Sequence, residues 1–223
     1  MPKIISEKLS TKVYFVLKDM IANYRFQQGA RLNIEQITKE LGVSRTPVWE
    51  AVSRLEQEGL LETFPNRGVF MTVLTPQRSL QLYQVREVLE SMAGGLAATR
   101  IKKTTLNKME KCLEKQQKAI QKSDLVGYSR SDFEFHAFVY ENCGNSYLQE
   151  FLEDIKNKIR PITFHIEPIL SRLYEDHVEI FKSLKTRDPN KAMAAFSRHN
   201  RKMIEEIEKS IETNSWKKIG AKK

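Results

Sequence analysis

The tight turn LGVS at residues 41–44 constrains the fold most, because it joins two amphipathic segments with almost no intervening chain. Beyond the turn, apolar residues recur at i, i+3, i+4 and i+7, which predicts a helix over 44–58 with one buried face. Ser44 can cap that helix and Gly59 can end it. Before the turn, the spacing of apolar residues predicts a short helix over 34–41. The two helices are therefore expected to share a core.

The rest of the first 74 residues completes a small domain. A further amphipathic helix is predicted over 6–23. After the helix over 44–58, two short β-rich runs flank the turn PNRG at 65–68, which predicts a hairpin. The order helix, helix, tight turn, helix, hairpin is that of a winged helix-turn-helix. Residues 1–74 are therefore predicted to form a winged helix-turn-helix domain.

From residue 75 onward the pattern is helical. Thr75 can cap a helix, and Pro76 suits its first position. The predicted helices span about 76–101, 104–122, 124–143, 145–171 with a kink considered at Pro161 or Pro168, 172–186 and 188–212. The chain is thus mainly α. It is predicted to contain an all-α bundle of about six helices at 75–215 and a basic tail at 216–223.

Charge and cysteine content narrow the class of protein. The net charge of +9 suggests an acidic partner such as nucleic acid, yet residues 1–74 carry only ten Lys and Arg against eight Asp and Glu. Charge alone therefore does not locate a DNA site. We expect Cys112 and Cys143 to be free thiols. Without a signal peptide or an apolar run near ~18 residues, the protein is expected to be soluble and cytoplasmic, with no membrane partner.

Three of the four histidines lie in register with apolar stripes of predicted helices. Asp132 and His136 are i, i+4 on one helix, and His177 and His199 lie on two others. A single histidine of this kind is best explained as a satisfied core residue. Three imidazoles and a carboxylate facing one interior favour a bound divalent cation, since an unpaired buried carboxylate is expensive. His165 lies outside this pattern.

Longer motifs carry a family resemblance. The run LNIEQITKELGVSRTPVWEAVSRLEQEGLLETFPNRGVFM closely resembles the DNA-binding domain of the GntR superfamily of bacterial transcription regulators. The helical half resembles the FadR branch, whose effector-binding domain is of the FCD type. The matching pieces are VREVLE (85–90), DFEFHAFVYENCGNSYL (132–148), DHVEIFKSL (176–184) and DPNKAMAAFSRHN (188–200). The likeness covers about residues 8–207.

The resemblance implies a DNA-reading surface on the helix over 44–58 and the hairpin. Arg45 and Thr46 would contact phosphates or base edges in the major groove. The alternative is that both are solvated surface residues. Trp49 departs from the family, which usually carries arginine there. The tryptophan could pack on a thymine methyl or on sugars, or cover a neighbouring side chain. In the wing, Arg67 would reach the minor groove or a phosphate, and Gly68 allows the turn.

The resemblance also implies a metal and an effector. Asp132, His136, His177 and His199 occupy the four family positions that bind a divalent metal, zinc foremost, with nickel or manganese as alternatives. Open coordination positions could accept the carboxylate of a small organic acid. Arg86 would be a second anchor for that anion, or else would form a surface pair with Glu90. Weaker candidates for effector binding are Asn157 and Arg160.

The function that follows is a ligand-responsive transcription regulator. A homodimer bound to a short pseudo-palindromic DNA operator is expected, because one recognition helix reads few bases. Repression is the expected mode. The first rival is a metalloenzyme, which leaves the winged domain unexplained and lacks an obvious general base or nucleophile pair. The second rival is a regulator whose metal is purely structural.

Overall fold

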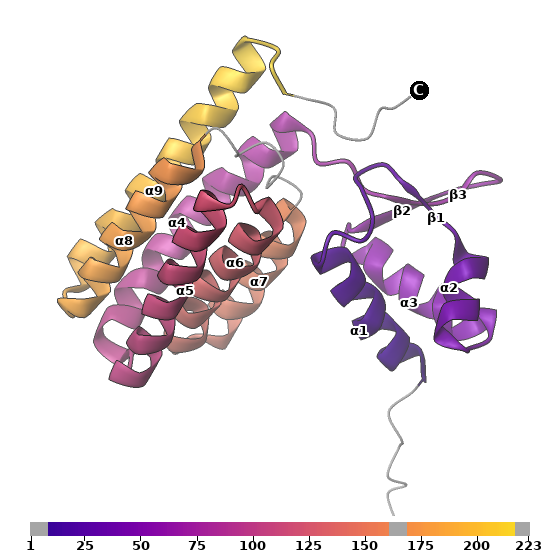
Figure 1. The fold of residues 1–223 in the computed structure, drawn as a ribbon, viewed down its shortest axis with the longest axis horizontal. Helices are drawn as coiled ribbons and strands as arrows, with labels where there is room; N and C mark the ends of the chain where they lie inside the picture. Colours follow the sequence, from indigo (N-terminus) through magenta and orange to yellow (C-terminus); the bar gives the residue numbers. More distant parts are fainter. Residues whose placement is uncertain (1–8, 161–168, 217–223) are drawn as a thin grey trace, which may run out of the picture. The chain divides into compact units, whose positions relative to one another are not determined.

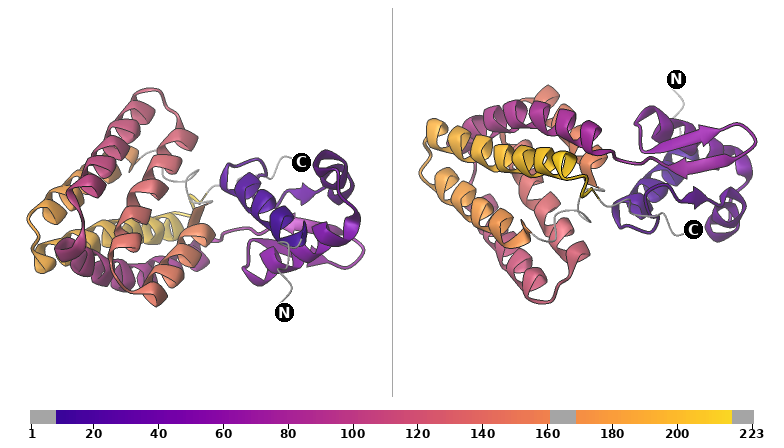
Figure 2. Two further views of the ribbon diagram at one scale, coloured as in Figure 1. Left: turned by 90° about the horizontal axis from the view of Figure 1, so that it is seen from below. Right: turned by 90° about the horizontal axis from the view of Figure 1, so that it is seen from above.

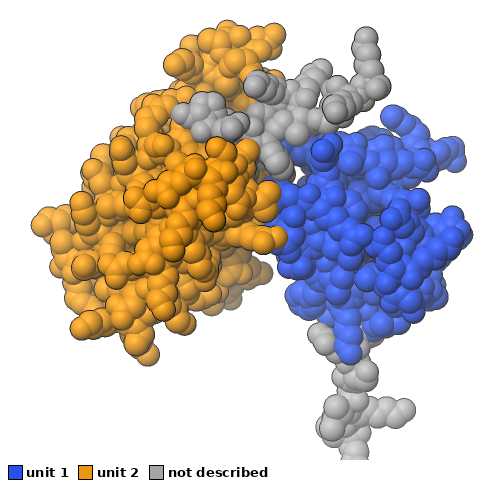
Figure 3. Space-filling view, in the orientation of Figure 1, with its two compact units in different colours: residues 1–73, 218–223 blue, residues 74–217 orange. Residues whose placement is uncertain are grey.

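The computed structural model describes residues 9–160 and 169–216. The chain divides into two compact units, which Figure 3 colours separately. Unit 1 comprises residues 1–73 and 218–223, and unit 2 comprises residues 74–217. The described parts contain nine helices and one three-stranded sheet (Figure 1). None of the described helices is both long and apolar enough to cross a lipid bilayer.

Unit 1 contains three helices and a small sheet. Its helices are α1 (Leu9–Ala22), α2 (Ile34–Leu41) and α3 (Arg45–Gln57). Gly42 ends α2 with a φ of 63°, as the tight turn requires. The predicted stripe of α3 is buried to 1% exposure or less, at Val48, Ala51, Val52 and Leu55. Ser44 precedes α3 in an extended conformation, but its side chain makes no capping hydrogen bond.

The sheet of unit 1 forms the wing. The hairpin of β2 (Leu61–Phe64) and β3 (Gly68–Met71) confirms the prediction. A third strand, β1 (Arg31–Leu32), pairs with the other edge of β3 and gives the order β1-β3-β2. The sequence analysis missed β1 because two residues are too few for an alternating pattern to be visible.

Unit 2 is helical throughout its described residues. Its helices are α4 (Pro76–Arg100), α5 (Lys103–Gln121), α6 (Leu125–Asn142), α7 (Ser146–Ile159), α8 (Leu170–Lys185) and α9 (Pro189–Glu212). The prediction of about six helices is confirmed, but the single helix predicted over 145–171 is wrong. Helix α7 ends at Ile159 and α8 begins at Leu170. The considered kink at Pro161 or Pro168 lies outside the described residues, as does His165.

Helices α4 and α9 lie along each other, as both views of Figure 2 show. Two glycines of α4 make this approach possible. A Cβ on Gly94 would lie 2.2 Å from Phe196 Cδ2, and a Cβ on Gly95 would lie 2.6 Å from Met193 Cγ. The close contact brings the buried face of α9 against that of α4. Elsewhere in this core, Cys112 and Cys143 are buried free thiols, as expected.

Candidate metal centre and nucleic-acid interface

Three histidines from three helices meet inside unit 2. His136 on α6, His177 on α8 and His199 on α9 are at most 3% exposed. Each offers a ring nitrogen, and these three nitrogens lie within 4.8 Å of one another. The Nε2 atoms of His136 and His177 are 3.3 Å apart. The sequence placed these residues on buried stripes, and the fold brings the stripes to one point.

Asp132 lies at the same point, one helical turn before His136 on α6. Its Oδ1 is 3.3 Å from Nε2 of His177 and 3.8 Å from Nε2 of His136. The Asp132 side chain is 22% exposed, whereas the imidazoles of His136 and His177 are fully buried. The structure therefore assembles all four residues predicted to bind metal.

Each imidazole also holds its Nδ1 atom near a neighbouring side-chain oxygen. The pairs are His136 with Glu90 Oε1 at 2.8 Å, His177 with Gln116 Oε1 at 2.9 Å, and His199 with Asp176 Oδ2 at 3.7 Å. Metal-binding histidines commonly donate their second ring N–H to such an acceptor, which fixes the tautomer and the ring orientation. The first two pairs are short enough for hydrogen bonds, so in a neutral imidazole the proton would lie on Nδ1 and Nε2 would carry a lone pair.

This tautomer assignment provides a test of whether a metal fits. With both protons on Nδ1, the two Nε2 atoms that face each other at 3.3 Å would present two lone pairs and no proton. A cation between them removes the repulsion. In a tetrahedral site with Zn–N bonds of about 2.0–2.1 Å, the nitrogens lie about 3.3–3.4 Å apart. The spacing and donor type of His136 and His177 therefore fit a divalent metal.

Burial keeps His177 and His199 in the neutral form that binds metal. Burial lowers the pKa of His177 well below its ordinary value, and the neighbouring His199 and His136 lower it further. Burial also lowers the pKa of His199. Both imidazoles are therefore neutral near pH 7, as metal ligation requires.

Arg86 and Glu90 form an ion pair next to the histidines. Their Nη2 and Oε1 atoms are 2.9 Å apart, and the two side chains are only 5% and 0% exposed. The pair considered in the sequence analysis thus exists, but in the interior and not on the surface. Nη2 of Arg86 also lies 3.3 Å from both ring nitrogens of His136. Burial by itself would raise the pKa of Glu90, but the Arg86 guanidinium and His136 hold it well below its usual value.

Several residues of this network were missed from the sequence. Tyr140 donates its hydroxyl hydrogen to Glu90, and Asn200 donates an amide hydrogen to Glu90 Oε2 at 2.7 Å. Gln116 left the clearest signal, because it is a polar side chain within the apolar stripe of α5. Asn200 directly follows His199 and gave no separate signal.

A small cavity adjoins the histidines. Its polar lining residues are Tyr83, Arg86, Tyr128, Ser129, Asp132, Lys156 and His199. The cavity volume is about 20 Å³, room for roughly one water-sized occupant. Neither Asn157 nor Arg160 belongs to the described lining, and Arg160 lies over the Phe133 ring at 3.7 Å. From α7, Lys156 lines the cavity instead.

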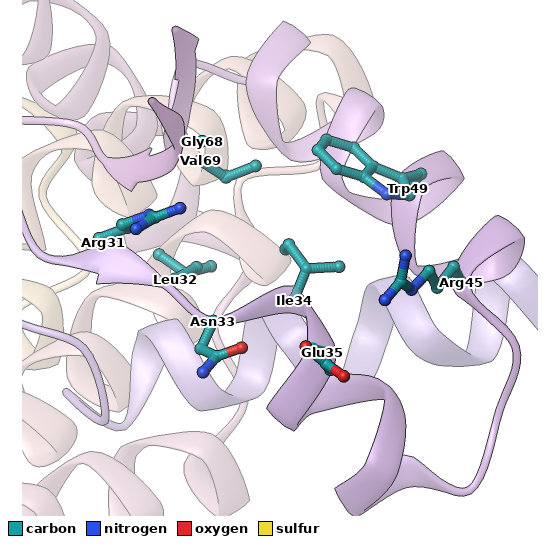
Figure 4. A pocket seen from close by; sticks show the side chains of 9 residues that line it. All are labelled: Arg31, Leu32, Asn33, Ile34, Glu35, Arg45, Trp49, Gly68 and Val69. Carbon is teal, nitrogen blue, oxygen red and sulfur yellow. The ribbon is translucent and has the colours of Figure 1, made fainter. Parts of the chain in front are cut away.

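Three of the five predicted DNA-reading residues line one groove of unit 1, and Thr46 and Arg67 are not among its described lining residues. Arg45 and Trp49 on α3 line a groove of about 410 Å³ together with Gly68 of the wing (Figure 4). The Trp49 side chain is 43% exposed. Thr46 is exposed on the first turn of α3. Arg67, at the hairpin turn, lies over Phe64 and Phe70 with 5.5 and 5.8 Å between its guanidinium carbon and the ring centroids.

The same groove contains two charged residues that the sequence analysis did not select. Arg31, on β1, lies against the wing so closely that a Cβ on Gly68 would be 3.0 Å from its Nε. Glu35, near the start of α2, supplies an acid. Arg31 was missed because β1 itself was missed. Two arginines, a glycine turn and an exposed indole form a surface suited to a nucleic-acid backbone and base edges.

Comparisons with known proteins give one family match in each of the two units. Residues 9–71 match the bacterial regulatory proteins of the gntR family, and residues 81–202 match the FCD domain. The chain is 31% identical over 183 residues to the HTH-type transcriptional regulator YdhC of Bacillus subtilis, covering 80% of this chain and 82% of that one. It is 23% identical to the HTH-type transcriptional repressor RspR of Escherichia coli, covering 94% and 93%.

Solved structures show the same fold. Escherichia coli McbR/YncC superposes with a TM-score of 0.80 at 22% identity, covering 92% of this chain and all of that one. A putative GntR regulator from Rhodococcus sp. RHA1 superposes with a TM-score of 0.77 at 25% identity, covering 90% and 98%. The chain therefore belongs to the GntR family of bacterial transcriptional regulators, carries an FCD domain, and is a DNA-binding regulator, not an enzyme.

Proposed function

We propose that this protein is a metal-containing repressor that binds a short two-fold symmetric operator as a homodimer and responds to a small carboxylate effector. The observation that carries the proposal is the pair of Nε2 atoms, on His136 and His177, that face each other at 3.3 Å while the Nδ1 atoms of both rings lie against side-chain oxygens. With the protons on Nδ1, the two Nε2 atoms would both be acceptors and could not satisfy each other, whereas a metal ion between them would accept both lone pairs.

Asp132, His136, His177 and His199 would hold the metal in this proposal. Three imidazole nitrogens and one carboxylate oxygen suit zinc first, and nickel or manganese are alternatives. When bound, the ion would supply an electrophilic position that can accept a carboxylate oxygen of the effector. Arg86, which lines the adjoining cavity, would be the second anchor of the same anion.

The winged unit would bind the operator. We place α3 in the major groove, where Arg45 and Thr46 contact phosphates or base edges and Trp49 offers an apolar face to a thymine methyl. Arg67 and Gly68 would bring the wing to the neighbouring minor groove. Repression is the proposed mode, in line with the relative that is named a repressor. The site of action would be the bacterial cytoplasm, where the DNA lies.

An exposed apolar stripe supports a homodimer. On α4, the side chains of Val85, Val88 and Met92 are 51%, 68% and 48% exposed, at i, i+3 and i+7. Helix α7 packs beside α4 and exposes Tyr147 and Phe151. Contiguous exposed apolar residues mark interaction surfaces, and a second copy of the chain can cover such a surface by two-fold symmetry.

The test combines elemental analysis with DNA binding. The purified full-length protein should contain about one divalent metal per chain and should shift DNA flanking its own gene in a gel. Organic acids identified by mass spectrometry of the purified protein should release that DNA. A metal-free protein would contradict the metal site and the ligand response that depends on it. A protein that contains metal but whose DNA binding does not respond to any ligand would contradict the ligand-responsive part of the proposal. The second result would leave a structural metal.

A further inference from the structure

We infer that the cavity beside the metal ligands binds the second anionic group of a dianionic effector, through Lys156 and Tyr128. This inference rests on the proposed function, because the first carboxylate of the effector would lie on the metal. It assigns the effector to the short dicarboxylates and not to the monocarboxylates. Two buried donors of the cavity, the Tyr128 hydroxyl and Nε of Arg86, have no hydrogen-bond partner among the described residues.

Tyr128 carries an unused hydroxyl group. Its side chain is fully buried, it lines the cavity, and its hydroxyl has no hydrogen-bond partner among the described residues. Its ring stacks at 6.5 Å on that of His177, so the phenol stands beside the proposed metal. Burial raises the pKa of Tyr128 well above its ordinary value, so the group stays protonated and can donate. A buried unpaired hydroxyl is expensive and points to a ligand.

Lys156 is a half-buried cation without an anion among the described residues. Its Nζ donates to the backbone oxygen of Phe133 at 3.0 Å and lies 5.3 Å from the ring centroids of Phe133 and Tyr140. Within the described ranges, no carboxylate oxygen lies close enough to Nζ for an ion pair. Burial lowers the pKa of Lys156 to about 8, with Arg160 the next contribution, so the ammonium is still the main form at pH 7. A bound anion would repay that burial.

Arg86 adds a third free donor. Its Nη2 is engaged by Glu90, but its buried Nε has no hydrogen-bond partner in the described part of the chain. Donors therefore outnumber acceptors in the cavity, whose one lining carboxylate, Asp132, is a proposed metal ligand.

The charge balance sets the effector class. A divalent ion with Asp132 leaves one positive charge, and Lys156 adds another, while Arg86 and Glu90 neutralise each other. Two negative charges on the effector balance this site. The cavity of about 20 Å³ must widen to admit such a molecule. The wall residue suited to move is Lys156, which is half-buried and has a flexible aliphatic stem.

The experiment uses zinc-loaded full-length protein and calorimetric titration with matched acids of equal chain length. The pairs are butyrate with succinate and pentanoate with glutarate. The better dicarboxylate should bind about tenfold tighter than its matched monocarboxylate, since it adds charge-assisted hydrogen bonds. Lys156→Met should abolish that preference by lowering dicarboxylate affinity to about the level of the matched monocarboxylate. Lys156→Arg should retain the preference, and Tyr128→Phe should reduce it.

Lys158→Met is the matched control, because Lys158 is on the same helix but pairs with Asp154 at 2.6 Å and does not line the cavity. It should bind like wild type. Melting curves of each variant establish that it folds, and Lys156→Gln replaces Lys156→Met if that variant does not.

Two results would overturn the inference. The first leaves the proposed carboxylate effector standing, and the second contradicts it as well. Equal affinity of wild type for both members of each pair, or an unchanged preference in Lys156→Met, removes the second anchor. Zinc-dependent monocarboxylate binding would then leave the proposed function standing. No binding of any acid to protein with confirmed zinc content contradicts the carboxylate effector itself, and the inference falls with it.

Discussion

Glu90 contacts four side chains around the candidate metal site, although it is not itself a proposed metal ligand. Its fully buried carboxylate contacts Arg86, His136, Tyr140 and Asn200. Glu90→Gln removes the charge that pairs with the Arg86 guanidinium and weakens the orientation of His136. Breaking a buried pair by removing one partner costs about 3–5 kcal/mol, and losing an outer-shell partner of a metal ligand costs about 10–100-fold in metal affinity.

Urea unfolding of chelated protein and zinc titration measure the two effects of Glu90→Gln. Glu87→Gln is the control, because Glu87 lies on the same helix and pairs with the exposed Arg201. A surface pair of this kind contributes about 0–1 kcal/mol. Equal stability losses in the two variants would show that the Glu90 network does not behave as a buried one.

The depressed pKa values of His177 and His199 predict the pH dependence of stability in chelated protein. As the pH falls below 6.5, the ordinary histidine pKa, His177 and His199 bind protons in the unfolded chain but stay neutral in the native protein. The free energy of unfolding should therefore decrease with falling pH, by about 1.4 kcal/mol per pH unit for each histidine. Urea midpoints between pH 7.5 and 5 provide the measurement. A flat profile would contradict the burial of neutral histidines.

Trp49 and Arg45 make separable predictions at the DNA surface. Arg45→Ala should weaken operator binding by about 1–3 kcal/mol if Arg45 reads a base, or weaken binding to all DNA sequences alike if it holds a phosphate.

Trp49→Arg should change the preferred operator sequence, since a guanidinium can donate hydrogen bonds to two acceptors of guanine and an indole cannot. Selection from a random DNA library measures the effects of both substitutions. An unchanged selection profile in Trp49→Arg would mean that Trp49 touches no base.

Element boundaries show where sequence reasoning works and where it stops. Thr75 caps α4 by accepting from the backbone of Arg78, as local pattern predicted, because caps and stripes are short-range signals. Strand β1 escaped prediction because it depends on pairing with β3, which is distant in sequence. Arg86 and Glu90 were correctly spaced for a pair, but spacing cannot tell whether their face of α4 is buried. The network around Glu90 required the packing of α4, α6 and α9.

The contact between α4 and α9 provides a prediction at the level of elements. A Cβ at Gly94 would collide with the ring of Phe196, which lies one turn before His199. Gly94→Ala should cost about 1–3 kcal/mol by overpacking, reduced by up to about 1 kcal/mol of better helix propensity. It should also weaken metal binding, because His199 moves with α9. Gln84→Ala, exposed on the same helix, should change neither property. A Gly94→Ala protein with unchanged zinc affinity would show that α9 accommodates the methyl group without moving His199.

At the scale of the whole molecule, the candidate metal site and the candidate DNA surface belong to separately packed units. The core of unit 1 is formed by its own helices and wing, from Val13 to Met71. The proposed metal instead joins α6, α8 and α9 of unit 2. His177→Ala and His199→Ala should therefore lose metal and the ligand response, while operator binding persists without ligand control. Cys143→Ala, which also removes atoms from the buried core of unit 2 but no proposed ligand, should keep both.

Metal content and operator affinity, each with and without ligand, separate the outcomes for these variants. If His177→Ala and His199→Ala keep the wild-type metal content and the wild-type response of DNA binding to ligand, the two histidines are neutral side chains of the core and bind no metal. If they lose the metal and still respond, the metal is structural and the effector binds elsewhere, with Arg86 and Lys156 the next residues to replace. Loss of operator binding in the metal-free variants would mean that the winged unit depends on the helical unit for its fold. Because each domain has its own buried core, we expect persistent DNA binding without a ligand response.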